Sequence, residues 1–96
     1  IKVPKYAIWA MMKNKEPVLF IKQFRGIFKK IITMPIENEQ NCVSAKDLKA
    51  IAKKNQFNVI KANNFSEAIN YITSSDKKLI CCIGSLYNVG NILNKN

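Results

Sequence analysis

Four short apolar segments recur along the chain, and a polar turn and a stretch with helical spacing follow each one. The apolar segments cover residues 5–12, 29–36, 57–62 and 77–83. They are too short for buried helices and are rich in β-branched or aromatic residues. The pattern therefore predicts four buried strands.

Apolar residues with helical spacing follow each predicted strand. The expected helix starts are Pro17, Ser44, either Asn64 or Ser66, and Ser85. Proline suits a first helical turn, and Gly26 suits the end of the first helix. Ser44 with Asp47 three residues later forms a weak capping box. The apolar positions expected on the helices are Val18, Leu19, Ile21, Phe24 and Ile27, then Leu48, Ile51 and Ala52, then Ala68, Ile69 and Ile72.

The predicted order is β-α-β-α-β-α-β-α in a single domain covering residues 1–96. Strands that alternate with helices of about ten residues predict a parallel sheet with helices on both faces, hence an α/β fold. In such sheets ligands bind outside the carboxyl ends of the strands. The loops after the first and fourth predicted strands would both lie at that edge.

Two polar positions in these loops are candidates for binding an anion. Ser85 follows the fourth strand and opens a predicted helix, whose first N–H groups have no partner within the helix. Gly84 would let a carboxylate or phosphate approach the backbone closely. Lys13 and Lys15 follow the first strand and could supply positive charge. The alternative is that Gly84 and Ser85 are an ordinary turn and helix cap, and that the lysines are solvated.

The net charge of +10 first suggests a nucleic-acid partner. However, Arg25 is the only arginine, and the lysines are dispersed along the sequence instead of forming a block. The abundance of Lys, Asn and Ile is typical of an AT-rich, for example bacterial, genome. The sequence therefore disfavours nucleic-acid binding, although a positive surface would suit an anionic substrate.

Several classes of chemistry have no signature in the sequence. It contains no histidine, no phosphate-binding loop and no plausibly spaced pair of carboxylates. Cys42, Cys81 and Cys82 form no CxxC pair, and we expect buried apolar thiols in a reducing cytoplasm. No apolar run approaches the roughly 20 residues that span a bilayer, so we expect a soluble protein without a membrane partner.

Two segments resemble the folylpolyglutamate synthase/dihydrofolate synthase family of the Mur ligase superfamily. The segment "AIWAMMKNKEPVLFIKQFRGIFKKIITMPI" is similar to that family's strand, GMLxxKD turn, helix and strand. The segment "LICCIGSLYNVGNIL" is similar to its closing GSLYxVG stretch, and "VSAKDLKAIAKKN…FSEAINYI" fits the helices between them. The resemblance covers essentially the whole chain.

The resemblance implies a three-layer, Rossmann-like C-terminal domain, mostly parallel, of an ATP-dependent ligase in the folate pathway. Such enzymes phosphorylate a carboxylate of dihydropteroate or of the folate glutamate tail. The amine of L-glutamate then attacks the acyl phosphate. ATP and Mg²⁺ would be held mainly by a central domain, which this chain lacks together with the first strand and helix of its own domain. By this expectation the chain is a fragment, as its start at Ile1 also suggests, and is inactive alone.

Carried over by position, Lys15 and Ser85 would contact the incoming glutamate. Gly84, Leu86, Tyr87 and Glu16 would support them, with Glu16 standing where the family has aspartate. Ala10 stands where a glycine is usual, and its Cβ would crowd a close ligand. Two other hypotheses remain: a basic α/β module that binds RNA or another polyanion, and a non-functional remnant of a split gene.

Overall fold

The computed structural model describes residues 3–72 and 77–84, and its strands form one parallel sheet. The strands are β1 (Lys5–Ala10), β2 (Lys30–Thr33), β3 (Val59–Lys61) and β4 (Leu79–Gly84). Their spatial order is β3-β2-β1-β4, and every neighbouring pair is parallel. The predicted parallel α/β architecture is therefore confirmed.

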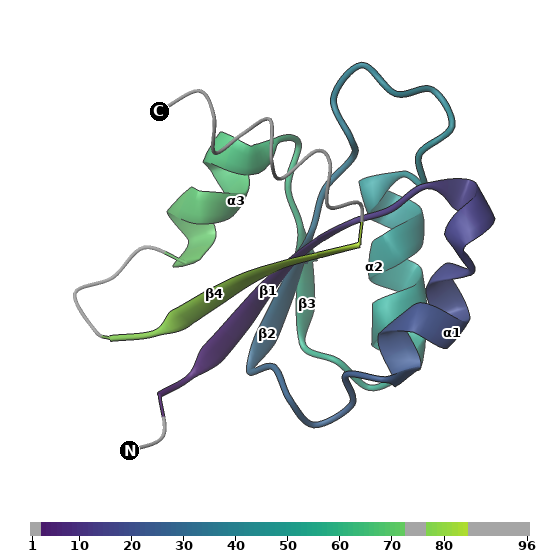
Figure 1. Cartoon of the computed structure of the whole chain (residues 1–96). Helices are drawn as coiled ribbons and strands as arrows, with labels where there is room; N and C mark the ends of the chain where they lie inside the picture. The colour runs from purple at the N-terminus through teal and green to yellow at the C-terminus, as the bar shows by residue number, and fades with distance from the viewer. Residues whose placement is uncertain (1–2, 73–76, 85–96) are drawn as a thin grey trace.

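The helices lie on both faces of the sheet. They are the short 3₁₀ helix η1 (Lys13–Lys15), α1 (Pro17–Lys22), α2 (Ala45–Lys54) and α3 (Phe65–Ile72). Figure 1 shows α1 and α2 on one side of the strands and α3 on the other. The expected last helix, residues 85–95, lies outside the described residues. Within the described part of the chain, no helix has the length and apolar character needed to cross a membrane.

Two separate hydrophobic cores fill the spaces between the sheet and its helices. Trp9 and Ile31 belong to the core that includes residues of α1 and α2, whereas Ile8 and Ile32 belong to the core under α3. Successive side chains of a strand point to opposite faces, so the two cores use alternate residues of β1 and β2. Burial on both faces explains why these strands read as continuous apolar runs.

α1 contacts the core through fewer residues than its sequence suggests. Ile21 is fully buried, and Phe20 stacks on Trp9 with the ring centroids 6.4 Å apart. The expected positions that remain exposed are Val18 at 44%, Leu19 at 58% and Ile27 at 45%. The helix has only six residues, so it presents one narrow stripe to the sheet, and Ile27 lies in the turn beyond it. The expectation of a broad inward face was wrong here.

The predicted caps of α2 and α3 can now be compared with the structure. The Ser44 hydroxyl accepts a hydrogen bond from the backbone N–H of Asp47 at 3.1 Å, as expected. For α3, the Asn64 side chain accepts from the N–H of Glu67 at 2.8 Å. The Glu67 carboxylate in turn accepts from the N–H of Asn63 at 3.1 Å. Of the two candidate caps for α3, the structure therefore selects Asn64 over Ser66.

Replacing Asn64 with alanine should lower the free energy of unfolding by about 1 kcal/mol, because a helix N–H loses its acceptor. Ser66→Ala is the matched control on the same helix, and we expect a change within about 0.5 kcal/mol. Urea unfolding followed by far-UV circular dichroism measures both. Equal losses in the two variants would contradict the assignment of Asn64 as the cap.

Candidate functional site

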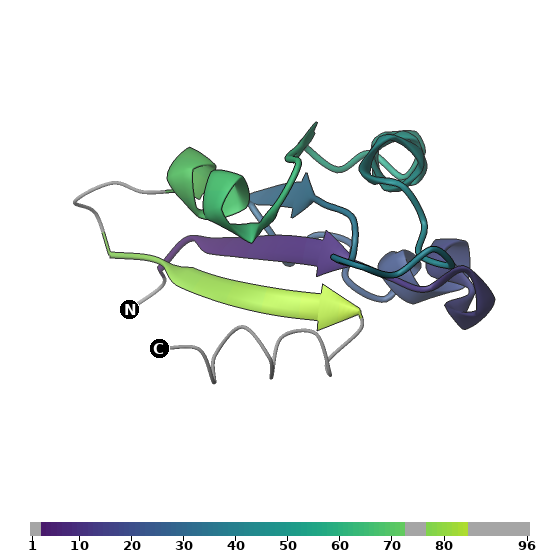
Figure 2. The ribbon, with the colours of Figure 1, turned by 90° about the horizontal axis from the view of Figure 1, so that it is seen from above.

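The order in which the strands are added to the sheet reverses between β1 and β4, although the two strands are parallel. The chain moves from β1 to β2 to β3 on one side and then crosses to pair β4 with the other edge of β1. In open α/β sheets the crevice for ligands lies at such a switch point, outside the carboxyl ends of the strands. Figure 2 shows β1 and β4 running side by side in the same direction. The last register pair is Ala10 with Gly84, so both candidate loops leave the sheet at this point.

The loop after β1 is fixed by the loop after β2. The N–H of Lys13 donates to the carbonyl of Asn41 at 2.9 Å, and the N–H of Val43 donates to the carbonyl of Met11 at 2.8 Å. Backbone bonds of this kind hold η1 in place at the rim of the sheet. Lysine side chains on η1 therefore extend from an anchored turn.

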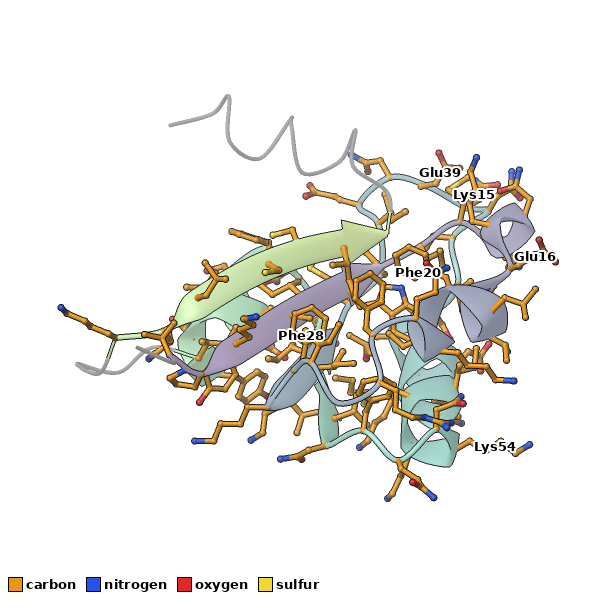
Figure 3. The ribbon with its side chains drawn as sticks, turned by 60° about the horizontal axis from the view of Figure 1, so that its bottom comes forward. Lys15, Glu16, Phe20, Phe28, Glu39 and Lys54 are labelled. Atoms are coloured by element: carbon orange, nitrogen blue, oxygen red, sulfur yellow. The ribbon has the colours of Figure 1, made fainter. Side chains whose placement is uncertain are left out.

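Lys15 and Glu16 end this anchored turn, and both are exposed. Glu16 has φ 51°, a left-handed conformation that lets the chain change direction between η1 and α1. Figure 3 shows both side chains at the end of the molecule beyond the β1 arrow. The structure thus places Lys15 at the predicted rim, where its ammonium group is accessible to a small anion.

A hollow of about 270 Å³ lies beside η1, and its lining includes Lys13 but not Lys15. The other residues that line it are Met12, Asn14 and Asn41. Of the two rim lysines, Lys13 thus has the more concave surroundings. The family resemblance singled out Lys15, and the hollow beside Lys13 was not foreseen because the wall formed by Asn41 comes from a different loop.

Gly84 ends β4 in a conformation that requires glycine. Its φ is 105°, and a Cβ built on it would lie 1.9 Å from the carbonyl oxygen of Ala10. The same Cβ would lie 3.3 Å from Cδ1 of Trp9. The missing side chain therefore allows the backbone of β1 to approach closely. From the sequence, a ligand was expected to be the group that approaches Gly84.

The other predicted site positions have different outcomes. Ser85, Leu86 and Tyr87 lie outside the described residues. Ala10 is 5% exposed and belongs to the core under α3, so its methyl group is packed against protein. The expectation that this methyl group would crowd a ligand at the rim was therefore wrong.

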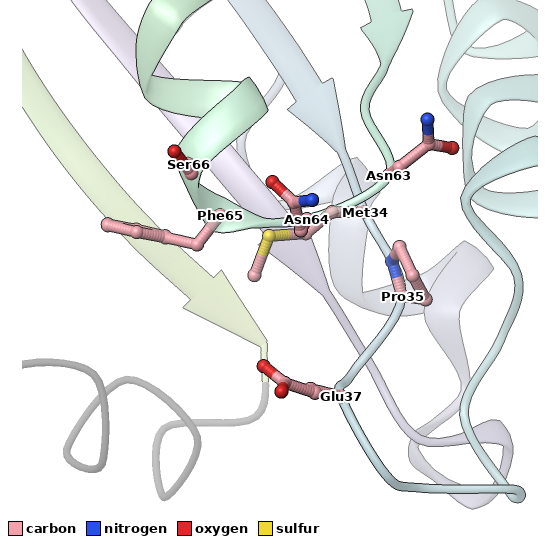
Figure 4. A pocket seen from close by; sticks show the side chains of 7 residues that line it. All are labelled: Met34, Pro35, Glu37, Asn63, Asn64, Phe65 and Ser66. Carbon is pink, nitrogen blue, oxygen red and sulfur yellow. The ribbon is translucent and has the colours of Figure 1, made fainter.

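A second hollow at the same edge of the sheet was not predicted from the sequence. It has a volume of about 410 Å³ and lies between the end of β2 and the start of α3. The residues that line it are Met34, Pro35, Glu37, Asn63, Asn64, Phe65 and Ser66. Figure 4 shows the Glu37 carboxylate across the hollow from Phe65 and Asn64. The only sequence signal was that polar residues follow two neighbouring strands.

The cysteines are less buried than expected. All three are free and only partly buried, with Cys81 and Cys82 at adjacent positions of β4. Burial, and next the neighbouring Cys81, raises the pKa of the Cys82 thiol. Cys82 is therefore protonated at neutral pH and a poor nucleophile. Among the residues described, no group of three His, Cys, Asp or Glu side chains could hold a metal ion.

Comparison with solved structures finds the same fold in two folylpolyglutamate synthases. The enzyme of Mycobacterium tuberculosis, crystallised with ADP and AMPPCP, matches with a TM-score of 0.80, at 13% identity, over 96% of this chain and 23% of that one. The enzyme of Thermotoga maritima matches with a TM-score of 0.77, at 23% identity, over 96% of this chain and 21% of that one. No protein-family model and no curated protein matches the sequence.

These two likenesses confirm the fold that the sequence resemblance implied. They extend over 96% of the chain. The chain spans less than a quarter of the length of either enzyme.

Proposed function

We propose that this chain is the C-terminal domain of an ATP-dependent ligase that adds L-glutamate to dihydropteroate or to the glutamate tail of a reduced folate. The observation that carries the proposal is the fold shared with two folylpolyglutamate synthases over 96% of the chain. The stretch "GSLYNVG", which resembles the same family, supports it independently. The domain would close over the reaction site in the cytoplasm, and it would be inactive alone.

The part proposed for this chain is to hold the incoming glutamate. The Lys15 ammonium group would neutralise one carboxylate of the amino acid, and the Ser85 hydroxyl would donate a hydrogen bond to a carboxylate. Leu86, Tyr87 and Glu16 are proposed as supporting residues of this site. The common exit of the loops after Ala10 and Gly84 at one rim supports this arrangement.

ATP and Mg²⁺ are assigned mainly to a central domain outside this chain. The sequence has no phosphate-binding loop, and the described residues contain no cluster of metal ligands. No catalytic step is therefore assigned to the described residues. Their contribution is to bind and position the amino acid that acts as the nucleophile.

Titration of the 96-residue chain with L-glutamate tests the proposal. We expect saturable changes in the amide resonances of residues 13–16 and 84–87, followed by two-dimensional NMR. Lys15→Met should weaken the apparent affinity about tenfold, since a charged hydrogen bond to the carboxylate is lost.

Lys22→Met is the matched control for this titration. Lys22 is also exposed but ends α1, away from the anchored turn, so the affinity should not change. A flat titration would favour a non-functional remnant that folds but binds nothing. Equal weakening by the two substitutions would show that only the net charge of the chain matters, and it would overturn the role of Lys15.

A further inference from the structure

The edge of the sheet opposite the candidate site collects lysines that are far apart in the sequence. Strands begin and helices end at this amino-terminal edge, because the strands are parallel and the helices return antiparallel to them. The lysines at strand starts and in the last turn of α2 are Lys5, Lys29, Lys30, Lys53, Lys54 and Lys77, called the basic edge below. Figure 1 shows these starts and ends at the opposite end of the strands from the arrowheads.

Backbone bonds establish that these segments are neighbours. The N–H of Lys29 donates to the carbonyl of Lys5 at 2.7 Å, which joins the starts of β1 and β2. The N–H of Ile31 donates to the carbonyl of Asn58 at 2.8 Å, which brings the chain just after α2 to the start of β2. The N–H of Leu79 donates to the carbonyl of Pro4 at 2.9 Å, which adds the segment of Lys77.

The described acidic residues are all at the other end of the molecule. They lie in the loops after β1 and β2 and in the first turns of α2 and α3: Glu16, Glu37, Glu39, Asp47 and Glu67. Asp76 lies outside the described residues. Acidic residues near the start of a helix and basic residues near its end stabilise the helix dipole, which explains part of this arrangement. Lysines occur at both ends of the molecule, but those of the basic edge lie away from every described acidic residue. The lysines at strand starts do not serve a helix dipole, so the helices alone do not explain them.

The side chains of the basic edge are available to a partner. Neighbouring cations do have internal roles: the Lys78 ammonium donates to the carbonyl of Ile72 at 2.6 Å, and Arg25 donates to Asn55 Oδ1 at 3.4 Å. No ion pair or side-chain hydrogen bond within the described residues engages the lysines of the basic edge. Five of the six are exposed and Lys30 is half-buried. Ammonium groups that share one edge without a described acidic neighbour repel one another, and a bound anion would relieve that repulsion.

An exposed aromatic ring lies at the same edge. Tyr71 is 52% exposed and sits in the last turn of α3, next to Ile72, whose carbonyl Lys78 holds. Tyr6 is half-buried and pairs in register with Lys30. A row of ammonium groups beside an aromatic face suits a strand of phosphates with bases that stack. A protein surface rich in carboxylates would pair with the ammonium groups but would offer no base to stack on the exposed ring of Tyr71.

We infer that the basic edge binds the phosphate backbone of single-stranded nucleic acid without sequence preference. Four strands about 4.8 Å apart make an edge of about 15 Å, which is long enough for two or three phosphates. The dispersal of lysines along the sequence had argued against such a partner. The parallel topology reverses that argument, because it brings the starts of distant strands together. The inference does not depend on the proposed ligase function.

Fluorescence anisotropy with a labelled single-stranded 12-nucleotide oligouridine tests the inference. We expect binding whose logarithmic salt dependence has a slope of about −0.7 for each phosphate neutralised. Lys29→Glu with Lys54→Glu replaces two positive charges of the basic edge by negative ones, which lowers the net charge by four, and should weaken binding at least tenfold. The matched control is Lys46→Glu with Lys61→Glu, which changes the net charge equally but at the carboxyl edge. It should weaken binding less than threefold.

The competing outcomes are distinguishable. Equal weakening by the two double variants would show attraction to net charge alone and would overturn the inference. Binding of poly-glutamate as tightly as oligouridine would overturn it in favour of an acidic protein partner, and no binding of the wild-type chain would also overturn it. If circular dichroism shows that a glutamate variant is unfolded, the corresponding glutamine pair provides the same comparison with smaller expected effects.

Discussion

Replacing Gly84 with alanine is expected to lower the free energy of unfolding by about 4 kcal/mol, a large fraction of the stability of a domain of this size. Two independent costs combine. A non-glycine residue at φ 105° is strained by about 1–3 kcal/mol. The new methyl group would also overlap the carbonyl oxygen of Ala10 at 1.9 Å, and relieving that overlap costs about 1–3 kcal/mol more.

Gly26→Ala is the matched control for this prediction. Gly26 also has a positive φ, 81°, but a Cβ there would meet nothing within 4 Å. The substitution should therefore cost about 1–2 kcal/mol, from backbone strain alone. Urea unfolding of the two variants and the wild type measures the difference. A loss for Gly84→Ala no larger than that for Gly26→Ala would show that β4 can move away from β1 without cost.

The close contact between Gly84 and the end of β1 also changes the interpretation of the Gly84–Ser85 pair. From the sequence, the glycine was expected to let a ligand approach the backbone closely. In the structure the close neighbour is the end of β1, so glycine is needed for the two strands to finish together at the rim. The glycine at this position is therefore explained by the packing of the two strands without a ligand.

The fold was predictable because burial on both faces leaves a strong signal. A segment such as residues 7–10 must be apolar at every position when helices cover both sides, and this excludes an amphipathic helix. The spatial order of the strands was not predictable, since nothing local in β4 indicates that it pairs with β1 instead of β3. The same limitation hid the basic edge, whose lysines become neighbours only through that order.

The candidate site was predictable only in part. Lys15 was identified because topology sends the loop after any parallel strand to the carboxyl edge. The two hollows were not found, because each has walls from loops that are distant in sequence, such as Asn41 beside η1. The failure at α1 has another cause: helical spacing continues through Ile27, but the hydrogen-bonded helix ends at Lys22. Spacing alone does not reveal where a helix ends.

Truncating Trp9 to alanine should lower the free energy of unfolding by about 3–5 kcal/mol, because it empties the centre of the core between the sheet, α1 and α2. Trp9 is 0% exposed and is the side chain against which Phe20 of α1 stacks. α1 has few other anchors, since Leu19 is 58% exposed. The loss should therefore include loosening of α1 from the sheet.

Trp9→Phe separates the packing of the ring from its polar group. The buried indole Nε1 has no hydrogen-bond partner among the described residues, and an unsatisfied buried donor costs about 1–3 kcal/mol. Phenylalanine removes that donor while it keeps an aromatic face for Phe20, so the smaller ring and the removed donor should nearly offset each other. We expect a net loss below about 1.5 kcal/mol.

The two Trp9 variants must be compared by circular dichroism, because Trp9 is the single tryptophan of the chain and both substitutions remove its fluorescence. A loss for Trp9→Phe as large as that for Trp9→Ala would mean that the indole N–H has a partner that stabilises the native state. Since Cδ1 of Trp9 also faces Gly84, loosening at this position should spread to the corner where β4 ends. The Trp9→Ala variant should then exchange the amide protons of β4 faster, whereas Trp9→Phe should leave their protection close to that of the wild type.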